Sequence, residues 1–214
     1  MLIREVTDVI ERFAPLAWQE SYDNAGLIVG RPDDEVHRAL LAVDVTDEVM
    51  AEAEREGCDM VITHHPIVFH ALKRFNSADQ VQRCVERAIR GGIALYACHT
   101  NLDSAPGGMS WRLAEMLGVG DLRVLQPAQA DEKVGFGVVG ELPEPMATVE
   151  FMRRMQRVLG VRVVRHSDIA SPEVRRVAVC GVRGRGRVVG GDGTGGAPPS
   201  WRRHTDPWAA GPQA

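Results

Sequence analysis

The stretch "VITHHPIVF" at residues 61 to 69 decides the interpretation of the fold, because an apolar run ends there in two adjacent histidines and a proline. A short apolar run followed by turn residues is typical of a buried β-strand. A second stretch, "LYACHTNLD" at residues 95 to 103, repeats the arrangement with His and Asp after the apolar run. We therefore expect two buried strands that carry polar residues at their carboxyl ends.

The segments around these two strands alternate between extended and helical patterns. Further strands are expected at "GLIVG" and "HRALLAVDV", and a helix over residues 46 to 56. A capping-box pattern at Ser77 and Gln80 predicts another helix that runs to about Arg90 and stops at Gly91. Strands that alternate with helices favour a sheet covered on both faces. We predict an α/β fold of three layers, α/β/α, with a mostly parallel or mixed sheet.

A second block of similar pattern follows the first. It contains a strand at "VGFGVVGEL", a helix over residues 148 to 159, and strands at "VRVVRH" and "EVRRVAVCG". The last of these aligns without a gap with "EVHRALLAV" at residues 35 to 43, which indicates an internal duplication. We expect two pseudo-symmetric halves, a first half over residues 1 to 130 with the polar strand ends and an incomplete second half over residues 131 to 182.

The composition changes abruptly in the segment 183 to 214. This segment contains eight Gly and four Pro and no Leu, Ile or Phe. It cannot bury enough apolar area to offset the entropy of ordering it, so we expect a disordered tail. Because the change falls where the second half should continue with a helix, we hypothesise that the tail is a frameshift or truncation artefact.

The overall composition is that of an ordinary globular chain. The 214 residues are 44% hydrophobic, enough for a substantial core. No apolar run approaches the roughly 18 residues that cross a membrane, and the first residues do not resemble a signal peptide, so we expect a cytoplasmic location. The four cysteines show no metal-binding spacing and are expected to be reduced core residues. The net charge of −4 argues against nucleic acid as a partner.

The polar strand ends point to metal chemistry. The carboxyl ends of neighbouring parallel strands form the ligand-binding edge of an open α/β sheet, so both clusters should meet there. His64 and His65 are expected to point to opposite sides and to serve two ions, with Asp103 as a bridging carboxylate. Hydrogen-bonded structural histidines and an Asx turn at the aspartate are the plainer alternatives.

Two more positions are candidates for the same site. His99 suits either acid/base chemistry or the orientation of a metal ligand. The loop "SYDNAG" places Asp23 and Asn24 just before a strand, where they would contact substrate or serve only as turn residues.

Four motifs in order, "YDNAGLIVG", "LAVDVT", "ITHHP" and "HTNLDSAPGG", closely resemble the Nif-three-like family, whose members are also named GTP cyclohydrolase I type 2 homologues. The resemblance covers about residues 1 to 181. It implies a toroidal homohexamer and a dinuclear centre of divalent ions (Zn, Mn, Fe or Mg), with His64, His65 and Asp103 as ligands. The family's remaining His and Glu ligands have no counterpart here, so metal binding is expected to be weakened.

Three functions follow from these features. The first is a metal-dependent hydrolase that acts on a nucleotide or other small molecule, such as a GTP cyclohydrolase. The second is a non-catalytic, ring-forming protein that binds metal or a partner. The third is an inactive fragment of either.

Overall fold

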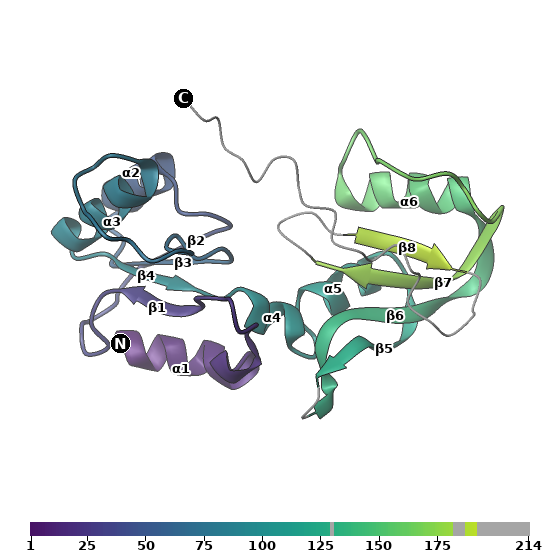
Figure 1. Ribbon diagram of the computed structural model, residues 1–214, viewed down its shortest axis with the longest axis horizontal. Coiled ribbons are helices and arrows are strands. Elements are labelled where there is room, and N and C mark those ends of the chain that lie inside the picture. Colours follow the sequence, from purple (N-terminus) through teal and green to yellow (C-terminus); the bar gives the residue numbers. More distant parts are fainter. Residues whose placement is uncertain (129–130, 182–186, 192–214) are drawn as a thin grey trace.

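The computed structural model describes residues 1 to 128, 131 to 181 and 187 to 191, and these form two lobes, each built around one sheet (Figure 1). The first lobe contains the elements α1 (Ile3–Phe13), η1 (Leu16–Trp18), β1 (Gly26–Val29), β2 (Ala39–Ala42), α2 (Asp47–Arg55), β3 (Met60–Thr63), α3 (Gln80–Gly91) and β4 (Ala94–Ala97). The second contains α5 (Met109–Met116), β5 (Gly120–Ala128), β6 (Asp131–Ala147), α6 (Thr148–Leu159), β7 (Glu173–Cys180) and β8 (Arg187–Gly191). The short helix α4 (Thr100–Ser104) lies between them.

The sheet of the first lobe is mixed, in the order β1-β4-β3-β2. Strands β2, β3 and β4 are parallel in register, and β1 pairs with β4 in the antiparallel sense. Helix α2 connects β2 to β3, and α3 connects β3 to β4, as parallel neighbours require. The expected α/β fold with a mixed sheet is therefore confirmed.

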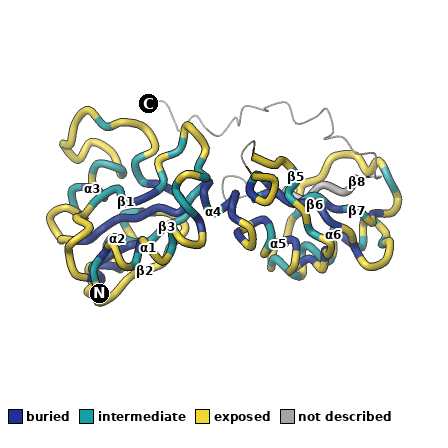
Figure 2. Tube along the Cα trace, turned by 90° about the horizontal axis from the view of Figure 1, so that it is seen from below, coloured by how far each residue is buried: buried dark blue, intermediate teal, exposed yellow. Residues whose placement is uncertain are grey.

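Helices cover both faces of this sheet, with α1 on one face and α2 and α3 on the other (Figure 1). Successive side chains of a β-strand point to opposite faces of the sheet, which explains how one strand can pack against helices on both faces. Val61 and Leu95 pack toward α2 and α3, whereas Met60 and Tyr96 on the same two strands pack toward α1. Figure 2 shows the buried residues running along the strands, with exposed residues in the outer loops.

Helix α3 begins two residues later than the capping-box pattern predicts. The N-cap is Asp79, whose side chain accepts a hydrogen bond from the backbone N–H of Gln82. Ser77 has a positive φ of 58° and bonds Glu86 instead. At the other end, Gly92 rather than Gly91 takes the left-handed conformation that closes the helix. The N-cap of α3 is therefore Asp79 and not Ser77, which the sequence pattern predicted.

The sheet of the second lobe is antiparallel throughout, in the order β5-β6-β7-β8. Helices α5 and α6 both contribute side chains to its core, with Leu117 next to α5 and Phe151 on α6 packing beside Val138 and Val177. The division expected at residue 130 would separate β5 from β6, although the two strands pair. Strand β5, which the apolar pattern did not reveal, belongs to this second sheet.

Two other expectations for the second half differ from the structure. The segment "VRVVRH" at residues 161 to 166 has no regular secondary structure, and Val163 is 77% exposed. The two aligned stretches also occupy different environments: β2 is an edge strand in a parallel pair, whereas β7 lies between antiparallel neighbours. Within the segment 183 to 214 the structure describes only strand β8, paired with β7; the rest of the expected tail lies outside the described residues.

The cysteines and the helix lengths agree with the composition. All four cysteines are buried and none forms a disulfide. Among the described residues no helix has the length and apolar character needed to cross a membrane.

Candidate metal centre

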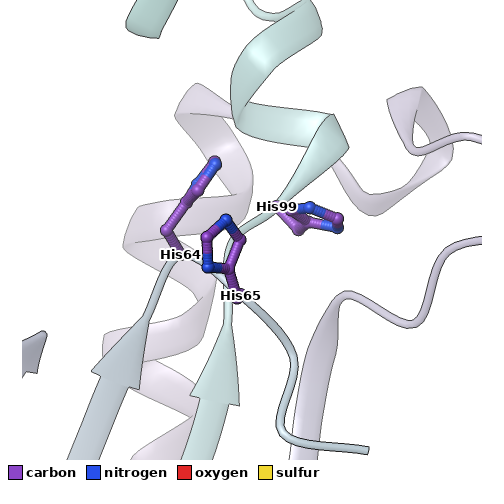
Figure 3. A group of neighbouring side chains, drawn as sticks. All are labelled: His64, His65 and His99. Atoms are coloured by element: carbon purple, nitrogen blue, oxygen red, sulfur yellow. The ribbon is translucent and has the colours of Figure 1, made fainter. Parts of the chain in front are cut away.

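Three histidines gather just beyond the carboxyl ends of β3 and β4 (Figure 3). His64 and His65 follow Thr63 directly, and His99 is the N-cap of α4, two residues after β4 ends. One ring nitrogen from each of them lies within 4.8 Å of the others. Strands β3 and β4 are adjacent and parallel, so the fold brings these separate sequence positions together.

His64 and His65 face the same cluster rather than opposite sides. Their ring centroids are 4.9 Å apart. The alternation of a strand does not apply to this pair, because both residues lie past the last residue of β3, where the backbone bends. The backbone N–H of His65 bonds the Val43 carbonyl, and the Thr63 hydroxyl donates to the His65 carbonyl. These two bonds fix the bend.

Each histidine is held through its Nδ1 atom. The Nδ1 atom of His64 lies 2.9 Å from the carbonyl oxygen of Cys98, that of His65 lies 2.6 Å from Asp44, and that of His99 lies 2.7 Å from Asp23. A carbonyl or carboxylate oxygen accepts, so Nδ1 carries the proton in all three rings. A neutral ring then presents the lone pair of Nε2, which is the arrangement found in metal-binding histidines.

Two buried polar atoms of the described residues lack a hydrogen-bond partner, and both lie here. They are the Nε2 atom of His65 and the Oδ1 atom of Asp103. Buried polar atoms are normally satisfied, so an unpaired imidazole nitrogen and an unpaired carboxylate oxygen among these residues fit the donor set of a divalent cation. The cluster of histidines and aspartate could thus hold a metal ion.

Asp103 projects from α4 into the cluster. Its Oδ2 atom lies 3.9 Å from the Nε2 atom of His64, and the residue is only 4% exposed. Burial raises the pKa of Asp103 to about 7, and the charge of Asp23 adds to this, against the opposing effect of His65. Burial also lowers the pKa of His64, aided by the neighbouring histidines. A neutral His64 is the form that ligates a metal.

Asp23 lies beneath His99, with no exposed side-chain surface. Besides His99, its carboxylate accepts bonds from the backbone N–H and the hydroxyl of Thr100. Burial acts to raise the pKa of Asp23, but the bonds from His99 and Thr100 outweigh it and hold this pKa below its usual value. Asp23 therefore positions His99 and the start of α4, and is not itself accessible to a substrate.

Asn24 lies apart from the cluster, where its exposed side chain donates to the Val68 carbonyl over 2.7 Å. Two hollows border this region. One of about 340 Å³ is lined in part by Asp44, Thr46 and His65, so it borders the His65 side of the cluster. The other, of about 490 Å³, is mostly apolar, and of the predicted site residues only Asn24 lines it.

Two residues of the site, Asp44 and Thr100, were not predicted from the sequence. Asp44 follows β2 just as the histidines follow β3, so the strand-end argument could have found it in the motif "LAVDVT". Thr100 gave no such signal. Helix α4 as a whole is unusual, because Thr100, Asn101, Asp103 and Ser104 are all buried. A buried polar helix of five residues is explained by the site that it supports.

The comparisons with known proteins agree with this fold. The model of the Duf34/NIF3 (NGG1p interacting factor 3) family matches residues 1 to 189. A protein of Clostridium perfringens named GTP cyclohydrolase 1 type 2 homolog is 32% identical over 192 residues, which cover 90% of this chain and 72% of that protein. A protein of the same name from Lactococcus lactis is 31% identical over 81% of this chain and 66% of its own length. The chain thus spans about two thirds of such relatives.

Solved structures show the same fold. The crystal structure of a Bacillus cereus protein related to NIF3 superposes with a TM-score of 0.79 at 23% identity, covering 85% of this chain and 76% of that one. Reduced HcgD from Methanocaldococcus jannaschii superposes with a TM-score of 0.64 at 30% identity, covering 73% of this chain and 60% of that one.

Proposed function

The chain belongs to the Duf34/NIF3 family, and on that premise we propose that it is a metal-dependent hydrolase-like protein acting on a small-molecule or nucleotide substrate, in the manner of a GTP cyclohydrolase type 2. One observation carries the proposal: three imidazoles, each hydrogen-bonded through Nδ1, bring one ring nitrogen apiece to within 4.8 Å of the others, and the buried Asp103 lies 3.9 Å from His64. Nitrogen and carboxylate donors suit Zn²⁺, Mn²⁺ or Fe²⁺ better than Mg²⁺.

The residues divide into two roles. His64, His65 and Asp103 would hold the ion, which when bound supplies Lewis-acid polarisation of the substrate and a more acidic water. His99 would move the proton, because Asp23 holds its Nδ1–H group and leaves the Nε2 atom of the ring to accept one. The described donors form one group, so we expect one ion to bind more tightly than any second.

The test compares metal content and turnover of GTP in the purified chain, loaded with Mn²⁺ or Zn²⁺. Asp103→Ala should lower both metal affinity and turnover. His99→Gln should keep the metal within about tenfold and lower kcat by about 100-fold or more, because only the proton transfer is lost. Asp33→Ala is the matched control. It removes an exposed carboxylate on the loop before β2, which forms an ion pair with Arg4 of α1. Equal turnover by Asp103→Ala and the unaltered chain would rule out this centre.

A second function is favoured by the family description, which names an interacting factor. In that case the chain would bind metal and assemble as a homohexameric ring without turnover. Leu41 on the edge strand β2 is 74% exposed and Val43, the residue after this strand, is 57% exposed; these apolar side chains support an assembly surface. Metal-loaded chain that does not turn over GTP, but that forms hexamers by light scattering, would favour this function over the hydrolase.

A further inference from the structure

The unpaired oxygen of Asp103 faces a residue of the second lobe that has no side chain. Asp103 lies on α4, between the two lobes (Figure 1), and its Oδ1 atom is buried without a hydrogen-bond partner. Gly181 is the residue that follows β7 in the second lobe. A Cβ atom at Gly181 would lie 3.4 Å from the Oδ1 atom of Asp103. The end of β7 therefore borders the candidate metal centre.

The space at Gly181 could hold one methyl group. A Cβ atom there would lie 3.7 Å from the Cβ atom of Met109 and 3.8 Å from the hydroxyl oxygen of Ser110. These distances are ordinary van der Waals contacts, so alanine would fit without a shift of the backbone. Gly181 also lacks the positive φ that favours glycine. Neither its backbone conformation nor crowding by the described residues requires a glycine at this position.

Hydrogen bonding and a tight turn fix Gly181 beside α4. Its backbone N–H donates to the hydroxyl of Ser110 over 3.1 Å, and Ser110 is only 1% exposed. Ser110 lies in the first turn of α5, which follows α4 closely. A side chain at Gly108, the N-cap of α5, would collide with the carbonyl oxygens of Leu102 and Ala105. The contact between the end of β7 and α4 is therefore built into the fold of both lobes.

We propose that Gly181 is a positioning residue of the metal centre, because its missing side chain keeps the space beside the Oδ1 atom of Asp103 open for the divalent cation. A buried carboxylate oxygen needs a cation or a hydrogen-bond donor to compensate it, and a methyl group offers neither. The inference rests on the metal centre of the proposed function. It adds that the second lobe forms one wall of that centre and limits the size of what binds there.

The experiment measures Mn²⁺ affinity by isothermal titration and the unfolding temperature of the metal-free chain in EDTA. Gly181→Ala should weaken Mn²⁺ binding about tenfold or more, because the methyl group fills the space, and should not lower the unfolding temperature. Gly181→Ser should also weaken Mn²⁺ binding. It should raise the unfolding temperature of the metal-free chain, because its hydroxyl can donate to the unpaired Oδ1 atom of Asp103.

Gly120→Ala is the matched control in the second lobe. A Cβ atom at Gly120 would meet only the carbonyl oxygen of Glu141, at 3.9 Å, so both measured quantities should be kept. Ser110→Ala removes the acceptor for the Gly181 N–H and should weaken Mn²⁺ binding by less than Gly181→Ala, because the space itself stays open.

Mn²⁺ binding that is equally tight in Gly181→Ala and the unaltered chain, or absent from both, would overturn the inference. Weakened binding with a lower unfolding temperature of metal-free Gly181→Ala would also overturn it, because the methyl group would then displace the structure instead of filling a space. GTP turnover is measured on the same samples. Mn²⁺ affinity that depends on residue 181 in a chain without turnover would support the inference while the hydrolase proposal fails. Turnover with an Mn²⁺ affinity independent of residue 181 would do the reverse.

Discussion

The two sheets are built from similar apolar strands, yet among the described residues the first alone gathers histidines at one edge. Strands β3 and β4 are parallel neighbours, so His64, His65 and His99 emerge at the same edge. Strands β6 and β7 are antiparallel, so residues after their ends emerge at opposite edges. The direction of the strands, rather than their composition, therefore decides which sheet can assemble a site.

The two lobes also differ in what lies buried beside the sheet. The core of the second lobe is apolar, with residues such as Leu142 and Val177. The first lobe continues into α4, whose buried Asp103 lacks a partner for one oxygen. A buried, unpaired carboxylate destabilises a protein unless a cation compensates it. The site thus lowers the stability of the metal-free first lobe. In the described part of the second lobe no buried side-chain polar atom lacks a hydrogen-bond partner.

The largest expected effect separates the lobes by their cores. Leu142→Ala should lower the free energy of unfolding by about 2 to 5 kcal/mol, because the side chain is fully buried in the second lobe. The Mn²⁺ affinity of the folded chain should not change. Leu95→Ala, in β4, should cost a similar amount and also weaken Mn²⁺ binding, since β4 leads to His99. Urea unfolding and Mn²⁺ titration measure the two quantities. Weakened Mn²⁺ binding in folded Leu142→Ala would break the comparison.

The next effect is a pH dependence of the free energy of unfolding, and it arises from Asp103 at the site of the first lobe. The pKa of Asp103 is raised to about 7 in the folded chain, from an ordinary value of 3.8. Between these values the unfolded chain has released a proton that the folded chain still holds, so stability falls as the pH rises toward about 7 and then levels off. Asp103→Asn should remove this fall and stabilise the metal-free chain at about pH 8 by on the order of 4 kcal/mol.

Thermal unfolding in EDTA at a series of pH values measures this difference. At about pH 3 and below the difference between the two chains should have disappeared, because Asp103 is then largely protonated in both states. Added Mn²⁺ should stabilise the unaltered chain and leave Asp103→Asn nearly unaffected. An Asp103→Asn chain that is less stable than the unaltered one at high pH would show that the carboxylate is compensated without metal.

The smallest effect tests the outer support of the cluster. Asp44→Ala removes the acceptor for the Nδ1–H group of His65 and should lower Mn²⁺ affinity about tenfold, at the lower end of such effects because this carboxylate side chain is 57% exposed. Asp44→Asn should have less effect, since the amide oxygen still accepts the bond. Isothermal titration measures both. An unchanged affinity in Asp44→Ala would mean that His65 needs no second partner to face the cluster.

Much of the first lobe could be predicted from residue patterns, because local and tertiary preferences agree there. The apolar runs before His64 and His99 predicted β3 and β4. The same argument applied to β2 would have predicted Asp44, the hydrogen-bond partner of His65. The second lobe was harder. Val161 and Val163 suggested a strand, but no strand in the described part of the chain pairs with them. Strand β5 was not predicted because its exposed residues mask the strand period.

The sequence by itself determined that two apolar strands end in histidines, a residue type that can bind a metal, since strand period and residue chemistry are local properties. Only the tertiary structure decided how these side chains meet. The bend after Thr63 turns His64 and His65 to the same side. Helix α4, which follows β4, places Asp103 next to His64. The tertiary structure also buries Asp23 behind His99 and pairs Tyr22 with Phe69. Such contacts join residues far apart in the chain, so no local pattern encodes them.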